Sequence, residues 1–275
     1  MGELTPDRVR KALLNEDAQI IEPNPDMVLP RPPALCAGCP HRGVFYELGR
    51  RKDLMIFSDI GCYSLGLMPP YNATDAMICM GASISAGHGV QKAFDIKGDH
   101  SKKVVSILGD STFFHSGITN LMDVTYNKSN TLTIILDNRI TGMTGHQQNP
   151  GTGYDLKGDA APMIDIEAMV KACGVKNLIS IDPNNLKIVQ EAIEWGLNID
   201  GPAVIITRWP CVLKKFSAQD NEEFPTAFKM VASVDLDTCI GCKKCLKSGC
   251  PALAFDRANK KSGILKETCV GCGVC

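Results

Sequence analysis

Most of the thirteen cysteines in this sequence of 275 residues are spaced as ligands rather than as disulfide partners. The run CIGCKKCLKSGCP has the pattern C-x2-C-x2-C-x4-C-P, and the run CVGCGVC has the pattern C-x2-C-x2-C. Iron–sulfur clusters are held by thiolates at such spacings. The two runs therefore predict cluster ligands at Cys239, Cys242, Cys245, Cys250, Cys269, Cys272 and Cys275.

The two runs are expected to exchange ligands. In two-cluster ferredoxins the fourth cysteine of a run ligates the other cluster, so Cys250 should join the three cysteines of the second run. The three cysteines of the first run would take their fourth ligand after residue 275, which suggests a tail that continues beyond this sequence. A zinc ribbon is the alternative, although two three-cysteine runs make poor tetrahedral pairs.

A second group of candidate residues follows two apolar runs. VVSILGD ends in Gly109 and Asp110, and TLTIILDN ends in Asp137 and Asn138. If the two runs are neighbouring parallel strands, Asp110 and Asn138 lie together, and their oxygens suit Mg²⁺. Backbone amides at the start of the next helix could bind phosphates. The alternative is a simple strand-to-helix turn in which Asp110 only caps the helix.

Other cysteines and one histidine are less specific signals. Cys36 and Cys39 form a C-x2-C pair, which could be half of a zinc site, a redox pair or two buried thiols. Cys62 and Cys211 each follow a predicted strand. His115 comes one helical step after the Asp110 turn, so it could face the same pocket and act as a catalytic residue, although a packed or solvated histidine is commoner.

The elements that must position these residues alternate along the chain. Six apolar, β-branched runs predict buried strands, and stretches with helical spacing separate them: LMIFSD, AMICM, VVSILGD, TLTIILDN, NLISID and AVIITR. This alternation predicts an α/β fold with a doubly wound parallel sheet, whose ligands bind at the carboxyl ends of the strands. Asp182 is expected to cap, and Pro183 to start, the helix before the last run.

Composition divides the chain into three predicted parts. Residues 1–33 hold a helix that reaches to about residue 20, with Thr5 as its cap, and a proline-rich linker. Residues 34–232 form the α/β domain. Residues 233–275 form a small ferredoxin-like domain whose stability depends on bound clusters, because so few residues bury little apolar surface.

The overall composition excludes several classes of protein. The formal net charge is −1, with 29 basic and 30 acidic residues, and no basic stripe indicates a nucleic-acid partner. The sequence shows neither a signal-peptide pattern at its start nor an apolar run long enough to span a membrane. A soluble, cytoplasmic protein is expected.

Several separated stretches together resemble one enzyme family: LCAGCPHRGVFYEL, FSDIGCYSLG, MICMGASISAGHG, ILGDSTFFHSGITNL and ILDNRITGMTGHQ. They look like the α subunit of indolepyruvate:ferredoxin oxidoreductase, one of the 2-oxoacid:ferredoxin oxidoreductases. The resemblance runs from about residue 30 to the end. GDS followed by DN is similar to the thiamine-diphosphate motif, with Ser111 in place of its second glycine and Asp137 in place of its first asparagine.

The resemblance implies roles for individual residues. Asp110, Asn138 and the carbonyl of Ile140 would hold Mg²⁺. Residues around thiamine diphosphate would be Gly61, Cys62, Met80, Gly81, Ser111 and Thr112. A proximal [4Fe–4S] cluster would be held by Cys36, Cys39, Cys62 and Cys211.

The resemblance also implies the reaction. A 2-oxoacid of the aryl-pyruvate type, such as indolepyruvate, would be decarboxylated oxidatively, its acyl group passing to coenzyme A and its electrons to ferredoxin. The implied partners are a pyrimidine-binding domain, expected to lie outside these residues, and a smaller β subunit. Two alternatives stay open, a non-oxidative thiamine-diphosphate decarboxylase and an electron-transfer subunit.

Overall fold

The computed structural model describes residues 4–17, 24–28 and 32–275, and the chain divides into two compact units, Met1–Pro33 and Ala34–Cys275. The first unit holds helix α1 (Pro6–Leu14) and a 3₁₀ helix, η1 (Pro25–Met27). Thr5 caps α1 as predicted, because its hydroxyl accepts a hydrogen bond from the Arg8 N–H. The helix is shorter than predicted, because Asn15 takes a left-handed conformation directly after Leu14.

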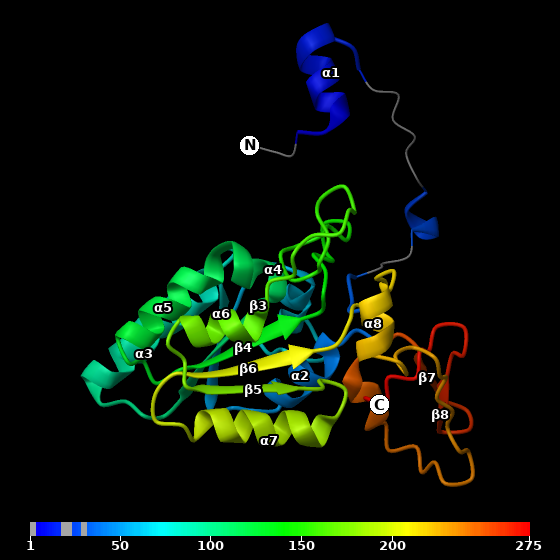
Figure 1. Cartoon of the computed structure of the whole chain (residues 1–275). Coiled ribbons are helices and arrows are strands. Elements are labelled where there is room, and N and C mark those ends of the chain that lie inside the picture. The colour runs from blue at the N-terminus through cyan, green and yellow to red at the C-terminus, as the bar shows by residue number, and fades with distance from the viewer. Residues whose placement is uncertain (1–3, 18–23, 29–31) are drawn as a thin grey trace. The chain divides into compact units, whose positions relative to one another are not determined.

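A six-stranded parallel sheet forms the centre of the second unit (Figure 1), in the order β2-β1-β3-β4-β6-β5. Each predicted apolar run contains one strand: β1 (Leu54–Ser58), β2 (Ala76–Met77), β3 (Lys103–Gly109), β4 (Leu132–Asp137), β5 (Asn177–Ile181) and β6 (Ala203–Arg208). The predicted α/β fold with a doubly wound parallel sheet is confirmed.

Helices cover both faces of this sheet (Figure 1). Helices α2 (His41–Leu48) and α7 (Leu186–Leu197) pack on one face, and α3 (Ala82–Lys97), α5 (Ile118–Tyr126) and α6 (Ile166–Ala172) pack on the other. Strand residues alternate between the two cores; in β4, Ile134 belongs to one and Ile135 to the other. The edge strands β2 and β5 are only partly buried, so the expectation of six buried strands is wrong at both edges.

Helix α7 begins later than predicted. Its N-cap is Asn185, whose side chain accepts a hydrogen bond from the Ile188 N–H. Asp182 instead accepts a hydrogen bond from the Asn184 N–H at 2.9 Å, which fixes a turn ahead of the helix. Asn185, the later of the two candidate capping residues, therefore caps the helix.

Several short elements complete the second unit. Around the carboxyl ends of the strands lie a 3₁₀ helix, η2 (Cys62–Leu67), a helical turn, α4 (Asp110–Thr112), and a π-helical turn, η3 (Phe113–Gly117). Helix α8 (Ala218–Glu223) precedes the segment that carries the two cysteine runs. That segment contains a 3₁₀ helix, η4 (Cys245–Ser248), and the antiparallel strands β7 (Leu253–Asp256) and β8 (Lys261–Ile264). Among the described residues, no helix has the length and apolar character that crossing a membrane requires.

Candidate functional site

A cavity of about 90 Å³ lies at the carboxyl ends of the central strands. Strands β3 and β4 are parallel neighbours with Gly109 opposite Leu136, so the residues that follow both strands meet at one edge. Most of the predicted cofactor and magnesium residues line this cavity: Gly61, Cys62, Met80, Asp110, Ser111, Thr112, Asn138 and Ile140. The prediction that the ends of these two strands lie side by side is therefore confirmed.

Asp110 occupies a position that suits a cation. Its side chain is 3% exposed and accepts hydrogen bonds from the Ser111 N–H at 2.7 Å and from Asn149 Nδ2 at 3.2 Å. Burial, together with the nearby negative charge of Asp137, raises the pKa of the Asp110 carboxyl. A divalent cation bound there would offset both effects, so the donor set fits Mg²⁺.

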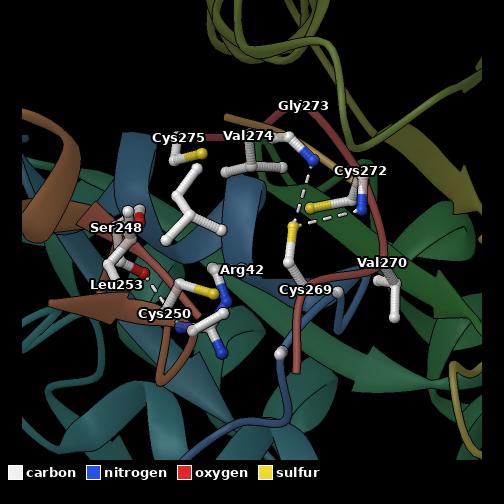
Figure 2. A pocket seen from close by; sticks show the side chains of 16 residues that line it. Arg42, Ser248, Cys250, Leu253, Cys269, Val270, Cys272, Gly273, Val274 and Cys275 are labelled. Carbon is white, nitrogen blue, oxygen red and sulfur yellow. Dashed lines mark hydrogen bonds between the residues drawn. The ribbon is translucent and has the colours of Figure 1, made fainter. Parts of the chain in front are cut away.

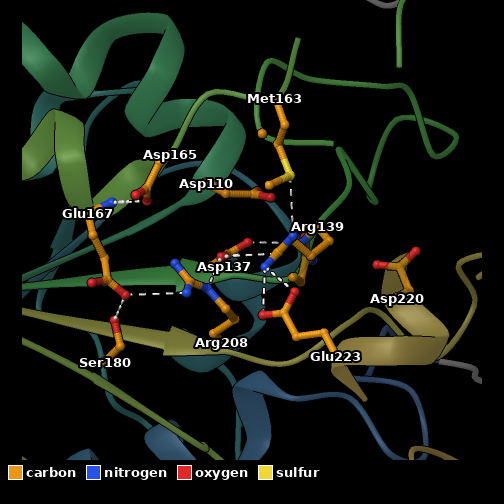
Figure 3. Close-up of polar contacts among 12 residues, drawn as sticks. Asp110, Asp137, Arg139, Met163, Asp165, Glu167, Ser180, Arg208, Asp220 and Glu223 are labelled. Atoms are coloured by element: carbon orange, nitrogen blue, oxygen red, sulfur yellow. Dashed lines mark hydrogen bonds and ion pairs between the residues drawn. The ribbon is translucent and has the colours of Figure 1, made fainter. Parts of the chain in front are cut away.

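An ionic network holds the end of β4 beside this carboxylate (Figure 3). Asp137 lies 2.9 Å from Arg208 Nε and 3.4 Å from Arg139 Nε. Arg139 also donates from one nitrogen to both oxygens of Glu223 at 2.8 Å. Arg139 has a φ of 60°, a left-handed conformation that is costly for such a residue, so these partners fix the turn that carries Asn138.

Asn138 connects the cavity to a predicted cluster ligand. Its side-chain oxygen accepts a hydrogen bond from the Ile140 N–H at 3.2 Å. Its backbone carbonyl accepts one from the Cys211 N–H at 2.9 Å. Two of the proposed magnesium ligands, Asn138 and Ile140, are therefore linked to Cys211 by hydrogen bonds.

Gly81 lies at the start of α3, beside the cavity rather than among its lining residues. Its φ is 86°, and a Cβ atom there would lie 2.2 Å from Ser116 Oγ. Asn120 Nδ2 donates to the Gly81 carbonyl at 2.6 Å. Asp59, fully buried after β1, accepts hydrogen bonds from the N–H and hydroxyl of Ser83 and so fixes the same helix start.

His41 and Tyr63 are among the lining residues that were not predicted from the sequence. The Tyr63 hydroxyl lies 2.8 Å from Thr112 Oγ1. His41 Nε2 lies 3.4 Å from Asn138 Nδ2, and burial lowers the pKa of His41 to about 4, so its ring is neutral at pH 7. The sequence signal for His41 was its position directly after Cys39 and Pro40.

His115 does not line the cavity and is exposed. It lies in η3, where a π-helical turn contains more residues than an α-helical one and therefore changes the directions of the side chains that follow Thr112. The structure thus gives no support to the expectation that His115 faces the pocket. A catalytic role for it stays a prediction.

Cys36, Cys39, Cys62 and Cys211, which we call the proximal set, lie near one another. Burial raises the pKa of Cys39 to about 12, and the thiols of Cys211 and Cys36 add to the effect. Burial likewise raises the pKa of Cys62, and Cys211 and Cys36 add to the effect. The described residues contain no group of three or more His, Cys, Asp or Glu side chains placed to hold a single metal ion. A cubane would bind each thiolate at a separate iron atom, so its ligands can lie farther apart than those of a single metal ion.

The structure brings together the four cysteines that the predicted exchange of ligands assigns to one cluster, and the exchange itself stays a prediction. One cavity is lined by Cys250, Cys269, Cys272 and Cys275, which we call the tail set (Figure 2). The free space between the residues is about 20 Å³, so they must move apart to accept a four-iron cluster. Cys239, Cys242 and Cys245 do not line it.

Cys239 and Cys245 lie at a separate position near β8. Hydrogen bonds from the backbone of Ser262 and Gly241 lower the pKa of the Cys239 thiol, which favours the thiolate form that a metal needs. Cys245 Sγ lies 3.3 Å from the Ser262 hydroxyl. This arrangement is compatible with a second cluster site.

Two family models match the chain. The C-terminal TPP binding domain of thiamine pyrophosphate enzymes matches residues 59–207, and the 4Fe-4S dicluster domain matches residues 232–275. The expected cofactors thiamine diphosphate and [4Fe–4S] are therefore confirmed at the level of the domains, and Mg²⁺ stays a proposal.

Relatives agree with this result. The chain is 37% identical over 277 residues to indolepyruvate oxidoreductase subunit IorA of Archaeoglobus fulgidus, covering 99% of this chain and 42% of that protein. It is 38% identical over 260 residues to the protein of the same name from Thermococcus kodakarensis, covering 90% of this chain and 40% of that protein. The chain thus spans about two fifths of the length of these curated relatives.

A solved structure has a similar fold. The 2-oxoglutarate:ferredoxin oxidoreductase from Magnetococcus marinus has a TM-score of 0.60 with 19% identity, over 70% of each chain. The resemblance to indolepyruvate:ferredoxin oxidoreductase α subunits is confirmed by the named relatives. Since its family model covers more than half of the residues, the chain belongs to the thiamine pyrophosphate enzymes with the C-terminal TPP binding domain.

Proposed function

We propose that this chain provides the pyrophosphate-binding site and the electron outlet of a 2-oxoacid:ferredoxin oxidoreductase that acts on aryl 2-oxoacids, indolepyruvate among them. The observation that carries the proposal is the position of Cys62. It lines the cofactor cavity, and its thiol is also close enough to Cys36 and Cys211 to be influenced by both. A cluster on the proximal set would therefore lie directly beside the cofactor.

The chain's own residues have distinct tasks in this proposal. Asp110, Asn138 and the Ile140 carbonyl hold Mg²⁺, and the backbone amides at Ser111 and Thr112 bind the phosphates. When bound, thiamine diphosphate supplies the carbanion that allows a 2-oxoacid to lose CO2, and the iron–sulfur clusters take electrons one at a time. Neutral His41 borders the same cavity, where its ring can donate or accept a hydrogen bond without carrying a charge.

The proposed reaction balances with two further co-substrates. One 2-oxoacid, one coenzyme A and two oxidised ferredoxins give acyl-coenzyme A, CO2, one proton and two reduced ferredoxins. The chain would act together with a pyrimidine-binding domain and a smaller β subunit, since thiamine-diphosphate sites are completed by a glutamate against the aminopyrimidine ring. The preference for aryl substrates is supported by the names of the relatives.

The test is an anaerobic assay of the chain assembled with its proposed partners. Reduction of methyl viologen that depends on indolepyruvate and coenzyme A is expected, with a higher kcat/KM for aryl than for alkyl 2-oxoacids. Release of CO2 without reduction of the dye would indicate a non-oxidative decarboxylase instead. Clusters that accept electrons in a protein unable to bind thiamine diphosphate would indicate an electron-transfer subunit.

A further inference from the structure

A guanidinium group is buried at the base of the segment that carries the cysteine runs. Arg42 is 1% exposed. One terminal nitrogen donates to the Tyr71 hydroxyl at 2.5 Å and to the Ser248 carbonyl at 2.9 Å. The other donates to the carbonyls of Leu35 and Cys36 at 2.5 and 2.6 Å. All of these partners are neutral, and no carboxylate of the described residues forms an ion pair with Arg42.

Such an arrangement leaves a buried charge without a counter-charge. Burying an unpaired ion costs several kcal/mol even after relaxation, and neutral hydrogen-bond partners offset only part of this cost. The Nε atom is also buried and has no hydrogen-bond partner in the described structure. The contacts of Arg42 therefore leave its positive charge without a counter-charge.

Thiol groups are the available source of negative charge around Arg42. Arg42 lines the cavity of the tail set, and Figure 2 shows its side chain among those cysteines. The same guanidinium donates to the Cys36 carbonyl, so it also lies beside the proximal set. A four-iron cluster with four thiolate ligands is an anion, and each electron that it accepts makes it more negative.

We propose that Arg42 is the shared counter-charge of two clusters, on the proximal set and on the tail set, and raises the reduction potential of both. The inference rests on the proposed function, in which both sets hold four-iron clusters. Net charge and hydrogen bonding around a cluster are among the factors that set its potential. A fixed cation between two clusters stabilises the added electron on either one.

The hydrogen bonds of Arg42 also join the two cluster loops. The Cys36 carbonyl belongs to a ligand of the proximal set, and Ser248 lies two residues before Cys250 of the tail set. The Tyr71 hydroxyl donates to the same Ser248 carbonyl at 2.6 Å. One buried side chain therefore connects the two cluster loops, and Arg42 itself lies 206 residues before Ser248 in sequence.

The experiment is an anaerobic redox titration of the cluster-loaded complex, followed by EPR. In Arg42→Gln the neutral side chain should make reduction of both clusters at least about tenfold less favourable, a shift of about 59 mV to more negative potential for a one-electron couple. Arg42→Lys keeps the charge and should retain most of the wild-type potential. Arg50→Gln removes an exposed arginine just after α2, the helix that contains Arg42, and should change neither potential.

A second variant separates the effect of the Arg42 charge from that of the hydrogen bonds that join the two loops. Tyr71→Phe removes one partner of Ser248 but keeps the guanidinium, so its potentials should equal those of the wild type. The proposal is overturned if Arg42→Gln holds both clusters at wild-type potentials, or if Tyr71→Phe shifts them as far as Arg42→Gln does. If neither Arg42→Gln nor Arg42→Lys holds clusters, the guanidinium is needed for its hydrogen-bonding geometry rather than for its charge. This result would also reject the proposal. Absence of four-iron clusters from the wild-type complex would instead remove the proposed function.

Discussion

At the scale of single residues, the cofactor cavity combines a carboxyl group and an imidazole that burial affects in opposite directions. Burial and Asp137 raise the pKa of Asp110, whereas burial lowers the pKa of His41 to about 4. Burial thus disfavours the charged form of both groups when the cavity contains no cation. Binding of Mg²⁺ would restore the charge of Asp110 and leave His41 neutral.

The first prediction concerns Asp110. In Asp110→Asn the side chain keeps its size but loses its charge, so affinity for Mg²⁺ with thiamine diphosphate should fall by more than the ~10–100-fold that loss of a ligand's supporting partner costs. Calorimetric titration with thiamine diphosphate at fixed Mg²⁺ measures this. Asp123→Asn, an exposed change on α5, is the control. Unchanged affinity in Asp110→Asn would exclude Asp110 as a metal ligand.

The second prediction concerns pH and His41. Between pH 6.5 and about 4 the unfolded chain binds a proton at this residue and the folded chain does not, so stability falls as the pH falls. Relative to His41→Gln, the wild type should lose about 3 kcal/mol of unfolding free energy between pH 7 and pH 4. Urea unfolding of both proteins at the two pH values tests this. Equal losses would mean that His41 titrates normally in the folded protein.

At the scale of elements, the start of α3 and the turn η3 determine the shape of the cavity's edge. Gly81 approaches Ser116 so closely that no side chain fits between them. Further along α3, Gly89 is exposed and has open space around its Cα atom. One helix thus contains a glycine that packing requires and another that packing does not.

These two glycines give the third prediction. Gly81→Ala forces a left-handed φ on alanine, at about 1–2 kcal/mol, and brings its Cβ atom against Ser116, so both stability and thiamine-diphosphate affinity should fall. Gly89→Ala should stabilise the protein by roughly 0.8–1 kcal/mol through helix propensity. Thermal unfolding and calorimetry measure both variants. A Gly81→Ala protein as stable as Gly89→Ala would contradict the close contact.

The sequence predicted the elements better than their arrangement. Apolar runs identified the six strands because strands buried in a parallel sheet need such runs. The order of the strands depends on long-range pairing, and no local signal shows that β6 lies between β4 and β5. Capping of α7 was misplaced because Asp182 and Asn185 compete locally.

The same limit applies to the candidate site. Asp110 and Asn138 were predictable because each follows a strand directly. His41 and Tyr63 enter the cavity through packing of α2 and η2, which spacing does not encode. The direction of His115 depends on a π-helical turn that the sequence did not reveal.

At the scale of the whole second unit, the segment with the cysteine runs packs on the C-x2-C turn of the α/β domain. Gly38 lies in that turn with a φ of 75°, and a Cβ atom there would lie 2.1 Å from Val270 Cγ2. Arg42 and Tyr71 bind Ser248 nearby. The proximal and tail sets are therefore held together by direct packing.

The fourth prediction tests this packing with a double-mutant cycle. Gly38→Ala should displace Val270, speed proteolytic cleavage of the tail segment and lower iron retention. Val270→Ala alone should have a small effect, and adding it to Gly38→Ala should restore part of the loss, because it removes the clashing methyl group. The strain of the positive φ should remain. Strictly additive effects would show that the two residues are not in contact.

The strand order has a consequence for how the protein is made. Strand β6 is synthesised after β5 yet lies between β5 and β4, and β5 pairs only with β6. On the ribosome, β4 therefore keeps an unpaired edge until residue 208 has been added, and such an edge invites pairing with other chains. The strand that covers this edge leads directly to Cys211, whose N–H binds the Asn138 carbonyl. The strand that closes the sheet during synthesis therefore also brings the last proximal cysteine to the turn that carries Asn138.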